Sequence, residues 1–157
     1  MAKHKTASET TLKPDPKYGN KLIAKFVNCM MWEGKKTVAE RIFYSAMNLV
    51  TTRVKDASAV EIFETAINNI KPTIEVRSKR VGGANYQVPM QVNRKRQQSL
   101  AFRWLIAAAR DKKGKPMHEK LAGEILDAFN NTGAAVTTKE NVHRMADANK
   151  AFAHFAW

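Results

Sequence analysis

The chain has 157 residues and a formal net charge of +13 at pH 7, because 27 lysines and arginines are set against 14 acidic residues. A chain of this length can bury a sizeable core within one domain. Its single cysteine excludes a disulfide framework, and no apolar run approaches the ~18 residues that a membrane span needs. We therefore expect a soluble cytoplasmic protein without a membrane partner.

The positive charge is concentrated in residues 71–115, which we call the basic stretch. It holds 12 lysines and arginines and only two acids, so it contributes +10 of the total. Clustered cations release counterions from phosphates, and a localised excess therefore favours a nucleic acid as the partner over a membrane surface. A generally basic solvated surface is the simpler alternative.

Residues 1–19 form the first predicted segment, an extended basic N-terminal arm. Two prolines in the sequence Pro-Asp-Pro-Lys-Tyr-Gly disfavour a helix and fix an extended path. Tyr18 has two interpretations, because its ring can stack on an RNA base or pack against the body of the protein. The candidate RNA-binding residues of the arm are Lys3, Lys5, Lys17 and Tyr18.

Residues 20–157 form the second predicted segment, a mainly α domain of about six helices. Apolar residues recur at helical spacing in three runs from Leu22 to Ile70, and we expect them, with Cys29, to form the core. The Ser/Thr-x-x-Glu pattern of a capping box precedes the second and third runs. These two patterns are Thr37 with Glu40 and Ser58 with Glu61. The predicted core stripe of the second helix is Val38, Ile42, Phe43, Leu49 and Val50.

The hydrophobic period changes from helical to alternating at about 73–92, which predicts one protruding β-hairpin. Gly82-Gly83 supplies the positive φ angles of its tight turn. An isolated ribbon is marginal in water, so we expect support from helices at its base or from a partner at its tip. We expect Tyr86 to pack, since it alternates with core-directed Val88. The predicted tip comprises Arg80, Val81, Gly82, Gly83, Ala84, Asn85 and Tyr86.

Three further helices are predicted after the hairpin. The first covers about 93–110, and the second begins near Pro116, a residue well suited to a first helical turn. Thr137 with Glu140 repeats the capping-box pattern and predicts the start of the last helix.

The start of the 93–110 helix carries Arg94, Lys95 and Arg96, at the end where the helix dipole disfavours cations. Free amide protons also favour an anion there, so a bound phosphate would relieve the conflict. Three solvated side chains are the alternative. We take these cations as RNA-binding residues, together with others on the hairpin, along and after this helix, in the turn after the first helix and near the last helix. The others are Lys35, Lys36, Arg77, Lys79, Arg103, Arg110, Lys113, Lys115, His143 and Arg144. A solvated pair is the alternative for Lys35 and Lys36, and ordinary surface is the alternative for His143.

The sequence lacks a pattern for catalysis or for binding a metal or cofactor. Gly82-Gly83 is not followed by the Gly-Lys-Ser/Thr of a phosphate loop, and the four histidines lack metal-ligand spacing. We therefore expect a protein without a cofactor that is not an enzyme. Two other hypotheses are an RNA-modifying enzyme and an architectural DNA-binding protein that uses the hairpin as an arm.

Four motifs resemble the family of the bacterial-type small-subunit ribosomal protein number seven. They are Pro-Asp-Pro-Lys-Tyr-Gly at 14–19, Gly-Gly-Ala-Asn-Tyr-Gln-Val-Pro at 82–89, Leu-Ala-Phe-Arg-Trp-Leu at 100–105 and His-Arg-Met-Ala-Asp-Ala-Asn-Lys-Ala-Phe-Ala-His at 143–154. The resemblance implies a six-helix body with a protruding hairpin. It implies a primary rRNA-binding protein that nucleates the head of the small subunit. It also implies that the hairpin and basic face lie near the exit-site tRNA, the mRNA exit path and other small-subunit proteins.

Both ends of the chain depart from the family pattern. The family's arm usually begins with an arginine cluster, where this chain has Ala-Lys-His-Lys. The family often has Tyr-Arg-Trp near its C-terminus, where this chain has Phe155-Ala156-Trp157. Loss of arginine removes bidentate phosphate contacts, so we expect RNA contacts mainly from the basic stretch.

Overall fold

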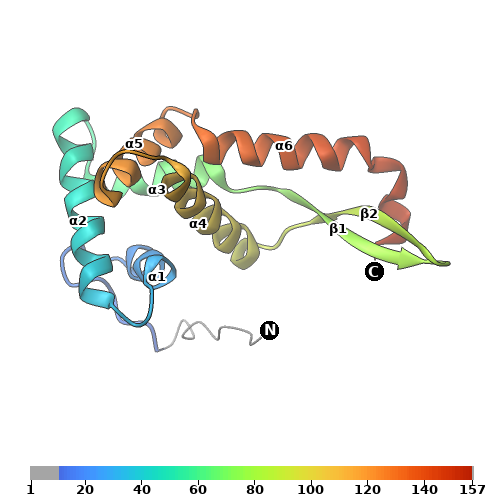
Figure 1. Cartoon of the computed structure of the whole chain (residues 1–157), viewed down its shortest axis with the longest axis horizontal. Helices are drawn as coiled ribbons and strands as arrows, with labels where there is room; N and C mark the ends of the chain where they lie inside the picture. Colours follow the sequence, from blue (N-terminus) through green and yellow to red (C-terminus); the bar gives the residue numbers. More distant parts are fainter. Residues whose placement is uncertain (1–10, 157) are drawn as a thin grey trace.

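The structure is a computed structural model that describes residues 11–156, so the candidate residues Lys3 and Lys5 lie outside the described part. A bundle of helices forms one end of the molecule, and a long hairpin projects from it beside the last helix (Figure 1). The elements are α1 (Lys21–Met30), α2 (Lys36–Arg53), α3 (Ala59–Ile70), β1 (Ile74–Val81), β2 (Ala84–Gln91), α4 (Arg94–Asp111), α5 (Met117–Phe129), α6 (Ala134–Ala148) and the 3-10 helix η1 (Lys150–Phe155). The predicted mainly α fold with one hairpin is confirmed.

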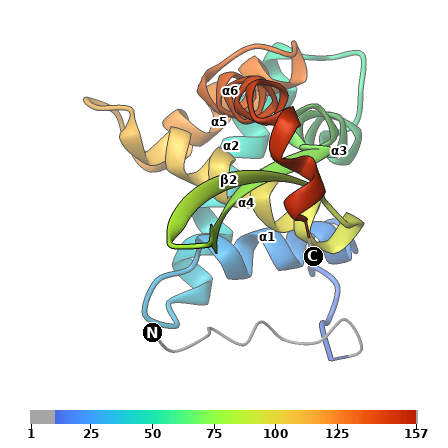
Figure 2. The same cartoon turned by 90° about the vertical axis from the view of Figure 1, so that its right-hand side faces the viewer.

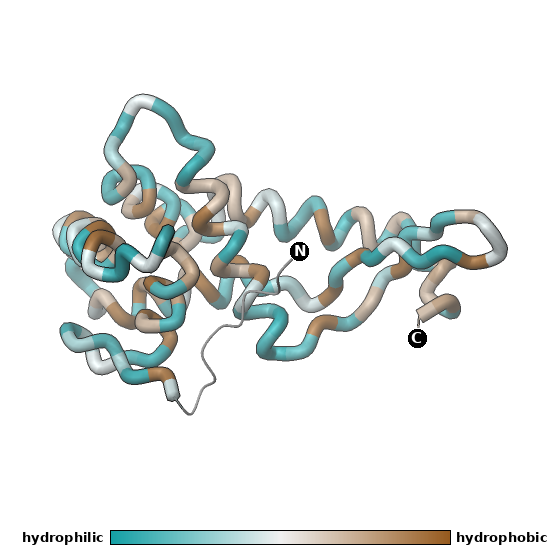
Figure 3. The backbone as a smooth tube through the Cα atoms, turned by 60° about the horizontal axis from the view of Figure 1, so that its bottom comes forward, coloured by the Kyte–Doolittle hydropathy of each residue, from teal (hydrophilic) through white to brown (hydrophobic). Residues whose placement is uncertain are grey.

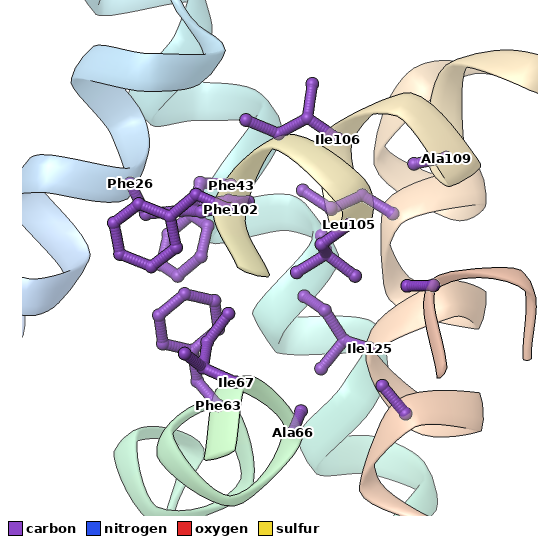
Figure 4. Packing of buried hydrophobic residues seen from close by; sticks show 14 of the residues in the cluster. Phe26, Phe43, Phe63, Ala66, Ile67, Phe102, Leu105, Ile106, Ala109 and Ile125 are labelled. Atoms are coloured by element: carbon purple, nitrogen blue, oxygen red, sulfur yellow. The ribbon is translucent and has the colours of Figure 1, made fainter. Parts of the chain in front are cut away.

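The core of the bundle is centred on four phenylalanine rings (Figure 4). Phe26 of α1 lies 5.6, 5.1 and 5.3 Å, between ring centroids, from Phe43, Phe63 and Phe102, which come from α2, α3 and α4. Tilted and edge-to-face pairs of this kind contribute about 0.5–1.5 kcal/mol each beyond the burial of their area. Apolar residues of α5 and α6 extend the same cluster, so one core joins all six α-helices of the described chain.

The capping box predicted at Ser58 is confirmed, and it begins α3. The Glu61 amide donates to Ser58 Oγ at 3.2 Å, and the Ser58 amide donates to Glu61 Oε2 at 2.9 Å. The hydrogen bond from the Ser58 amide also lowers the pKa of Glu61, because hydrogen bonds from Ser58 favour the ionised carboxylate.

The other two predicted capping boxes are wrong. Thr37 lies inside α2, which begins at Lys36 after Glu33 and Gly34 turn the chain with φ angles of 51° and 72°. Thr137 lies inside α6, because that helix begins at Ala134 directly after Gly133, whose φ angle is 93°. In both cases a backbone reversal a few residues upstream sets the helix start, before the threonine is reached.

Several predicted core positions are exposed. Val38 and Leu49 of α2 are 40% and 39% exposed, whereas alanines and Met47 of the same helix fill the interface with the other helices. Cys29 is also exposed, which corrects its prediction as a core residue. Small residues at helical spacing carry a weak sequence signal, although they allow helices to approach closely.

The arm departs from the predicted extended path at residues 15–18. These residues form a turn that packs against α2. Buried Asp15 accepts hydrogen bonds from the amides of Lys17 and Tyr18 at 3.1 and 3.0 Å and from the Tyr44 hydroxyl at 2.7 Å. Desolvation and the bond to Asp15 raise the pKa of Tyr44. The ring of Tyr18 packs edge-on against that of Tyr44, which favours the packing interpretation of Tyr18.

The hairpin is antiparallel, with Val81 opposite Ala84 across the predicted glycine turn. Its distal half packs on η1, where the ring of Tyr86 lies 5.3 Å from that of Phe152 and 5.0 Å from that of Phe155. Figure 2, viewed along the long axis, shows this C-terminal segment lying across the ribbon. The predicted packing of Tyr86 is confirmed. We call Tyr86, Phe152 and Phe155 the distal aromatic cluster.

Candidate nucleic-acid interface

The base of the hairpin holds two arginines on one carboxylate. Glu75 of β1 is only 8% exposed, and its Oε1 accepts from Arg77 Nε at 2.9 Å. Its Oε2 accepts from Nε and Nη2 of Arg96, in the first turn of α4, at 3.2 and 3.1 Å. We call these three residues the hairpin-base cluster. It carries one surplus positive charge, and both guanidinium groups remain partly exposed.

The start of α4 already has internal partners for some of its polar groups. The side chain of Asn93 accepts from the Arg96 amide at 2.9 Å and caps the helix. Glu75 places a carboxylate beside the Arg96 side chain at the same end. The conflict between cations and helix dipole is therefore partly relieved within the chain, and phosphate binding at this helix start stays a prediction. Arg94 and Lys95 are exposed.

A second basic region lies on the α4–α5 loop and the first turns of α5. Lys112, Lys113, Lys115 and Lys120, which we call the loop cluster, line a hollow of about 370 Å³. Lys113 and Lys115 are exposed, as expected for residues that contact RNA. Their neighbour Glu119 lines the same hollow.

Lys112 differs from the other lysines of the loop cluster, because its amine points toward two acids of α5. Its Nζ lies 2.7 Å from Glu124 Oε2 and 3.2 Å from Asp127 Oδ2. Partial burial alone would lower the pKa of Lys112, but the hydrogen bonds to the two carboxylates raise it overall. Glu124 is fully buried, and its Oε1 accepts from the Ala135 amide at 2.9 Å. This acid of α5 therefore supplies the cap of α6 that Thr137 was expected to provide.

Arg110 and Lys35, both predicted RNA-binding residues, lie beside an exposed tryptophan. Trp32 follows α1 and is 67% exposed. The guanidinium carbon of Arg110 lies 4.7 Å from the centroid of its ring, and Arg110 Nη2 donates to the Met30 carbonyl at 3.0 Å. These residues line an open pocket of about 370 Å³, which we call the Trp32 pocket.

Four other candidate residues contact the body of the protein. Lys79 Nζ donates to the Phe155 carbonyl at 2.8 Å, and His143 Nε2 accepts from the Thr73 amide at 3.2 Å. Lys17 Nζ donates to the Asn48 side chain at 3.2 Å, and Lys36 Nζ lies 3.9 Å from Glu40. The hairpin, α6 and the arm therefore use some of the predicted RNA-binding residues to hold themselves in place.

The remaining candidates are exposed, apart from half-buried Val81 of the hairpin tip. Arg103 and Arg144 lie on the surfaces of α4 and α6, and the hairpin tip from Gly82 to Asn85 is exposed throughout. The tube in Figure 3 shows the hairpin reaching beyond the bundle, with strongly hydrophilic residues before its turn. The predicted residues thus do not form one patch but several clusters on different elements.

Sequence reasoning missed Glu75, Trp32 and the special position of Lys112. Glu75 had a detectable signal, since it is one of only two acids in the basic stretch. Trp32 also had one, because a large aromatic residue directly precedes the Glu-Gly-Lys-Lys turn. The role of Lys112 depends on acids more than ten residues away in α5, and no local pattern reports it.

Comparison with known proteins identifies the family. The family described as ribosomal protein S7p/S5e matches residues 2–150. The chain belongs to this family. The small ribosomal subunit protein uS7 of Rhodopirellula baltica is 60% identical over 153 residues, which cover 97% of this chain and 98% of that protein. Proteins of the same name from Desulfotalea psychrophila and Thermotoga neapolitana are each 51% identical and cover 100% and 99% of both chains.

Membership of the S7p/S5e family confirms the predicted resemblance and class. The protein is a structural constituent of the ribosome in the cytoplasm, and the family is not one of enzymes. This finding argues against the RNA-modifying and DNA-binding alternatives. Within residues 11–156, no helix is long and apolar enough to cross a membrane. In the same part of the chain, no group of His, Cys, Asp or Glu side chains is arranged to hold a metal ion.

Proposed function

We propose that this protein binds the head-domain rRNA of the small subunit directly and nucleates assembly of the head. The observation that carries the proposal is the hairpin-base cluster, in which Glu75 fixes two guanidinium groups where β1 meets α4. Arginine presents a planar fork of donors that matches phosphate oxygens. Two forks held by one carboxylate are partly ordered before RNA arrives, so binding costs less side-chain entropy.

The proposal also assigns rRNA contacts to three other regions of the chain. These are the exposed cations at the start of α4, the loop cluster and the arm with Lys3, Lys5 and Lys17. Because the cations lie on separate elements, the surface fits a folded RNA junction better than a single straight helix. A-form RNA is recognised mainly by shape and by phosphate and 2′-hydroxyl contacts, which such a surface can provide.

We propose further that the hairpin tip lies near the exit-site tRNA and the mRNA exit path, beside other small-subunit proteins. The support is the family resemblance together with the projection of the hairpin from the bundle (Figure 1). The tip carries Arg80 and small exposed residues from Gly82 to Asn85. The small residues of the turn therefore allow its backbone to approach a second RNA closely.

The first experiment measures the salt dependence of binding to a head-domain rRNA fragment. If the protein neutralises about eight phosphates, log K falls against log salt with a slope of roughly −6 to −7. A slope near zero would refute the proposed electrostatic binding. Direct competition tests the alternative partner, because preference for duplex DNA over the folded rRNA fragment would favour the architectural hypothesis.

The second experiment separates rRNA binding from the role of the tip. We expect deletion of residues 80–86 to leave rRNA binding and head assembly in place while it disturbs handling of exit-site tRNA. Reconstitution of small subunits with the deleted protein measures both. Loss of head assembly in this variant would contradict the proposed division of roles. Omission of the protein should stop head assembly at an early step.

A further inference from the structure

We propose that the Trp32 pocket receives one unstacked base of the rRNA, from a strand whose phosphates follow the loop cluster. This inference rests on the proposed rRNA binding and names a site and a type of contact within it. The observations that support it are the exposure of Trp32, the cation on its ring, the apolar lining and the adjacent lysines. None of these contacts is needed by the hairpin-base cluster.

Trp32 is held as a platform rather than left as a loose surface side chain. The Arg110 guanidinium lies 4.7 Å from its ring centroid, at a distance typical of a cation–π contact. Arg110 is itself fixed by its hydrogen bond to the Met30 carbonyl, which ends α1. A flat ring that is 67% exposed and has a cation on one face leaves its other face to a ligand.

The rest of the pocket suits a flat, weakly polar group. Apolar side chains of α2, of the C-terminal end of α1 and of the start of α5 line the pocket. Val38 of α2 is among the exposed large hydrophobic residues of the protein. The volume of about 370 Å³ lies in the range of sites that hold small organic groups. The apolar lining residues are Met30, Met31, Val38, Ala39, Ile42 and Met117.

Charge favours an RNA strand over an apolar protein segment as the occupant. The described residues that line the pocket include Lys35 and Arg110 but no acid. Lys35 pairs with Glu33 at 2.8 Å on the surface, and exposed pairs of this kind are weak enough to exchange for a phosphate. Two residues after Arg110 the loop cluster begins and lines its own hollow.

An aromatic platform beside a basic track is the arrangement with which proteins hold single-stranded nucleic acids. Bases stack on the aromatic side chains while lysines and arginines follow the phosphates. Here Trp32 provides the platform, and Lys113, Lys115 and Lys120 of the loop cluster provide the track. A base that enters the pocket must leave its own stack, so the bound segment is a loop, a bulge or the end of a helix rather than continuous duplex.

The experiment compares Trp32→Ala and Trp32→Phe in the full chain, by equilibrium binding to the head-domain rRNA fragment. We expect Trp32→Ala to weaken binding about 10-fold, since stacking contributes about 1–3 kcal/mol per base. We expect Trp32→Phe to retain most of the affinity. The salt slope should stay unchanged in both, because no phosphate contact is lost. The matched control is Met145→Ala, which removes another exposed apolar side chain and should leave binding unchanged.

Ultraviolet crosslinking of the wild-type complex, followed by mass spectrometry of the digested protein, provides a second measurement. We expect a nucleotide adduct on the peptide that contains Trp32. Unchanged affinity of Trp32→Ala, with wild-type protein that still binds rRNA, would overturn the base pocket and leave the proposed function standing. Failure of the wild-type protein to bind would instead refute the proposed function. Loss of contact with a neighbouring small-subunit protein, but not with rRNA, would make the pocket a protein-docking site and overturn the inference.

Discussion

Two ion clusters that draw their cations from the basic stretch have opposite compositions. At the hairpin base, Glu75 holds two arginines and leaves one positive charge at a partly exposed surface. Between α4 and α5, two acids hold Lys112 and leave one negative charge, with Glu124 fully buried. In the first arrangement the exposed arginines can contact a polyanion. In the second, the cation offsets the energetic cost of burying a charged acid. The partners of a cation therefore decide its role more than its place in the sequence does.

The largest effect is expected from Lys112→Met, which removes the cation from the buried acid. An unpaired buried charge typically costs about 3–5 kcal/mol, and we expect about 3 kcal/mol because the Lys112 side chain is 37% exposed. Urea unfolding measures this loss of stability. The matched control is Lys113→Met, which should leave the stability nearly unchanged. Equal stability of both variants would show that the two clusters do not differ as described.

A slightly smaller loss is expected from Gly133→Ala, which disturbs the same cluster through the backbone. Gly133 has a φ of 93°, and an added Cβ would lie 2.7 Å from Asp127 Cβ and 3.0 Å from Glu124 Oε1. We expect a cost of about 2–3 kcal/mol in unfolding free energy. Gly114→Ala is the control, because its φ is 80° but an added Cβ there meets nothing within 4 Å. If both variants lose the same stability, the contact with Glu124 and Asp127 is unimportant.

The hairpin-base side of the comparison is tested through RNA affinity. We expect Arg94→Ala combined with Arg96→Ala to weaken rRNA binding about 10-fold, or about 1.4 kcal/mol. The salt slope should become shallower by roughly 1.4–1.8, at about 0.7–0.9 per phosphate contact. Arg77 remains on Glu75 in this variant, so the acid keeps a partner. Lys3→Ala combined with Lys5→Ala should cost less, and equal losses would contradict the central role of the α4 start.

The smallest effect is expected from Glu75→Gln, and its sign is informative. Removing an acid from a basic surface should strengthen RNA binding if charge alone matters. If Glu75 positions Arg77 and Arg96, affinity should instead fall about fivefold, or about 1 kcal/mol. Glu119→Gln is the control, because that acid lies among the lysines of the loop cluster without a hydrogen bond to them in the described residues. An equal gain in affinity for both variants would remove the positioning role of Glu75.

The sequence predicted the features that depend on neighbouring residues. The hairpin was predicted because alternation and Gly82-Gly83 agree, and the α3 start because Ser58 and Glu61 lie within one turn. The same capping pattern failed at Thr37 and Thr137. There the helices start earlier, after Gly34 and Gly133, and α6 is capped by Glu124 from another helix. A pattern of four residues cannot report a partner that tertiary packing brings from elsewhere.

The candidate site was predictable as a set of cations but not as an arrangement. Counting charge located the basic stretch and most of the exposed candidates, such as Lys113 and Lys115. Counting charge did not distinguish these residues from Lys112, whose amine forms ion pairs with two acids. Strand alternation placed Glu75 on the polar side of the ribbon, whereas its contacts with Arg77 and Arg96 bury it. These differences arise from long-range contacts, which composition cannot predict.

The distal aromatic cluster has a mechanical consequence for the hairpin. A two-stranded ribbon alone bends easily, but here Tyr86 is fastened to Phe152 and Phe155, and η1 continues from α6. At 1.5 Å per residue, the 15 residues of α6 make a strut of about 22 Å along the ribbon (Figure 1). A sideways force on the tip therefore acts on both the strands and the helix, and the helix resists bending of the hairpin. At the other end of α6 the Ala135 amide donates to Glu124, so the stiffness of the tip depends on a carboxylate at the opposite end of that helix.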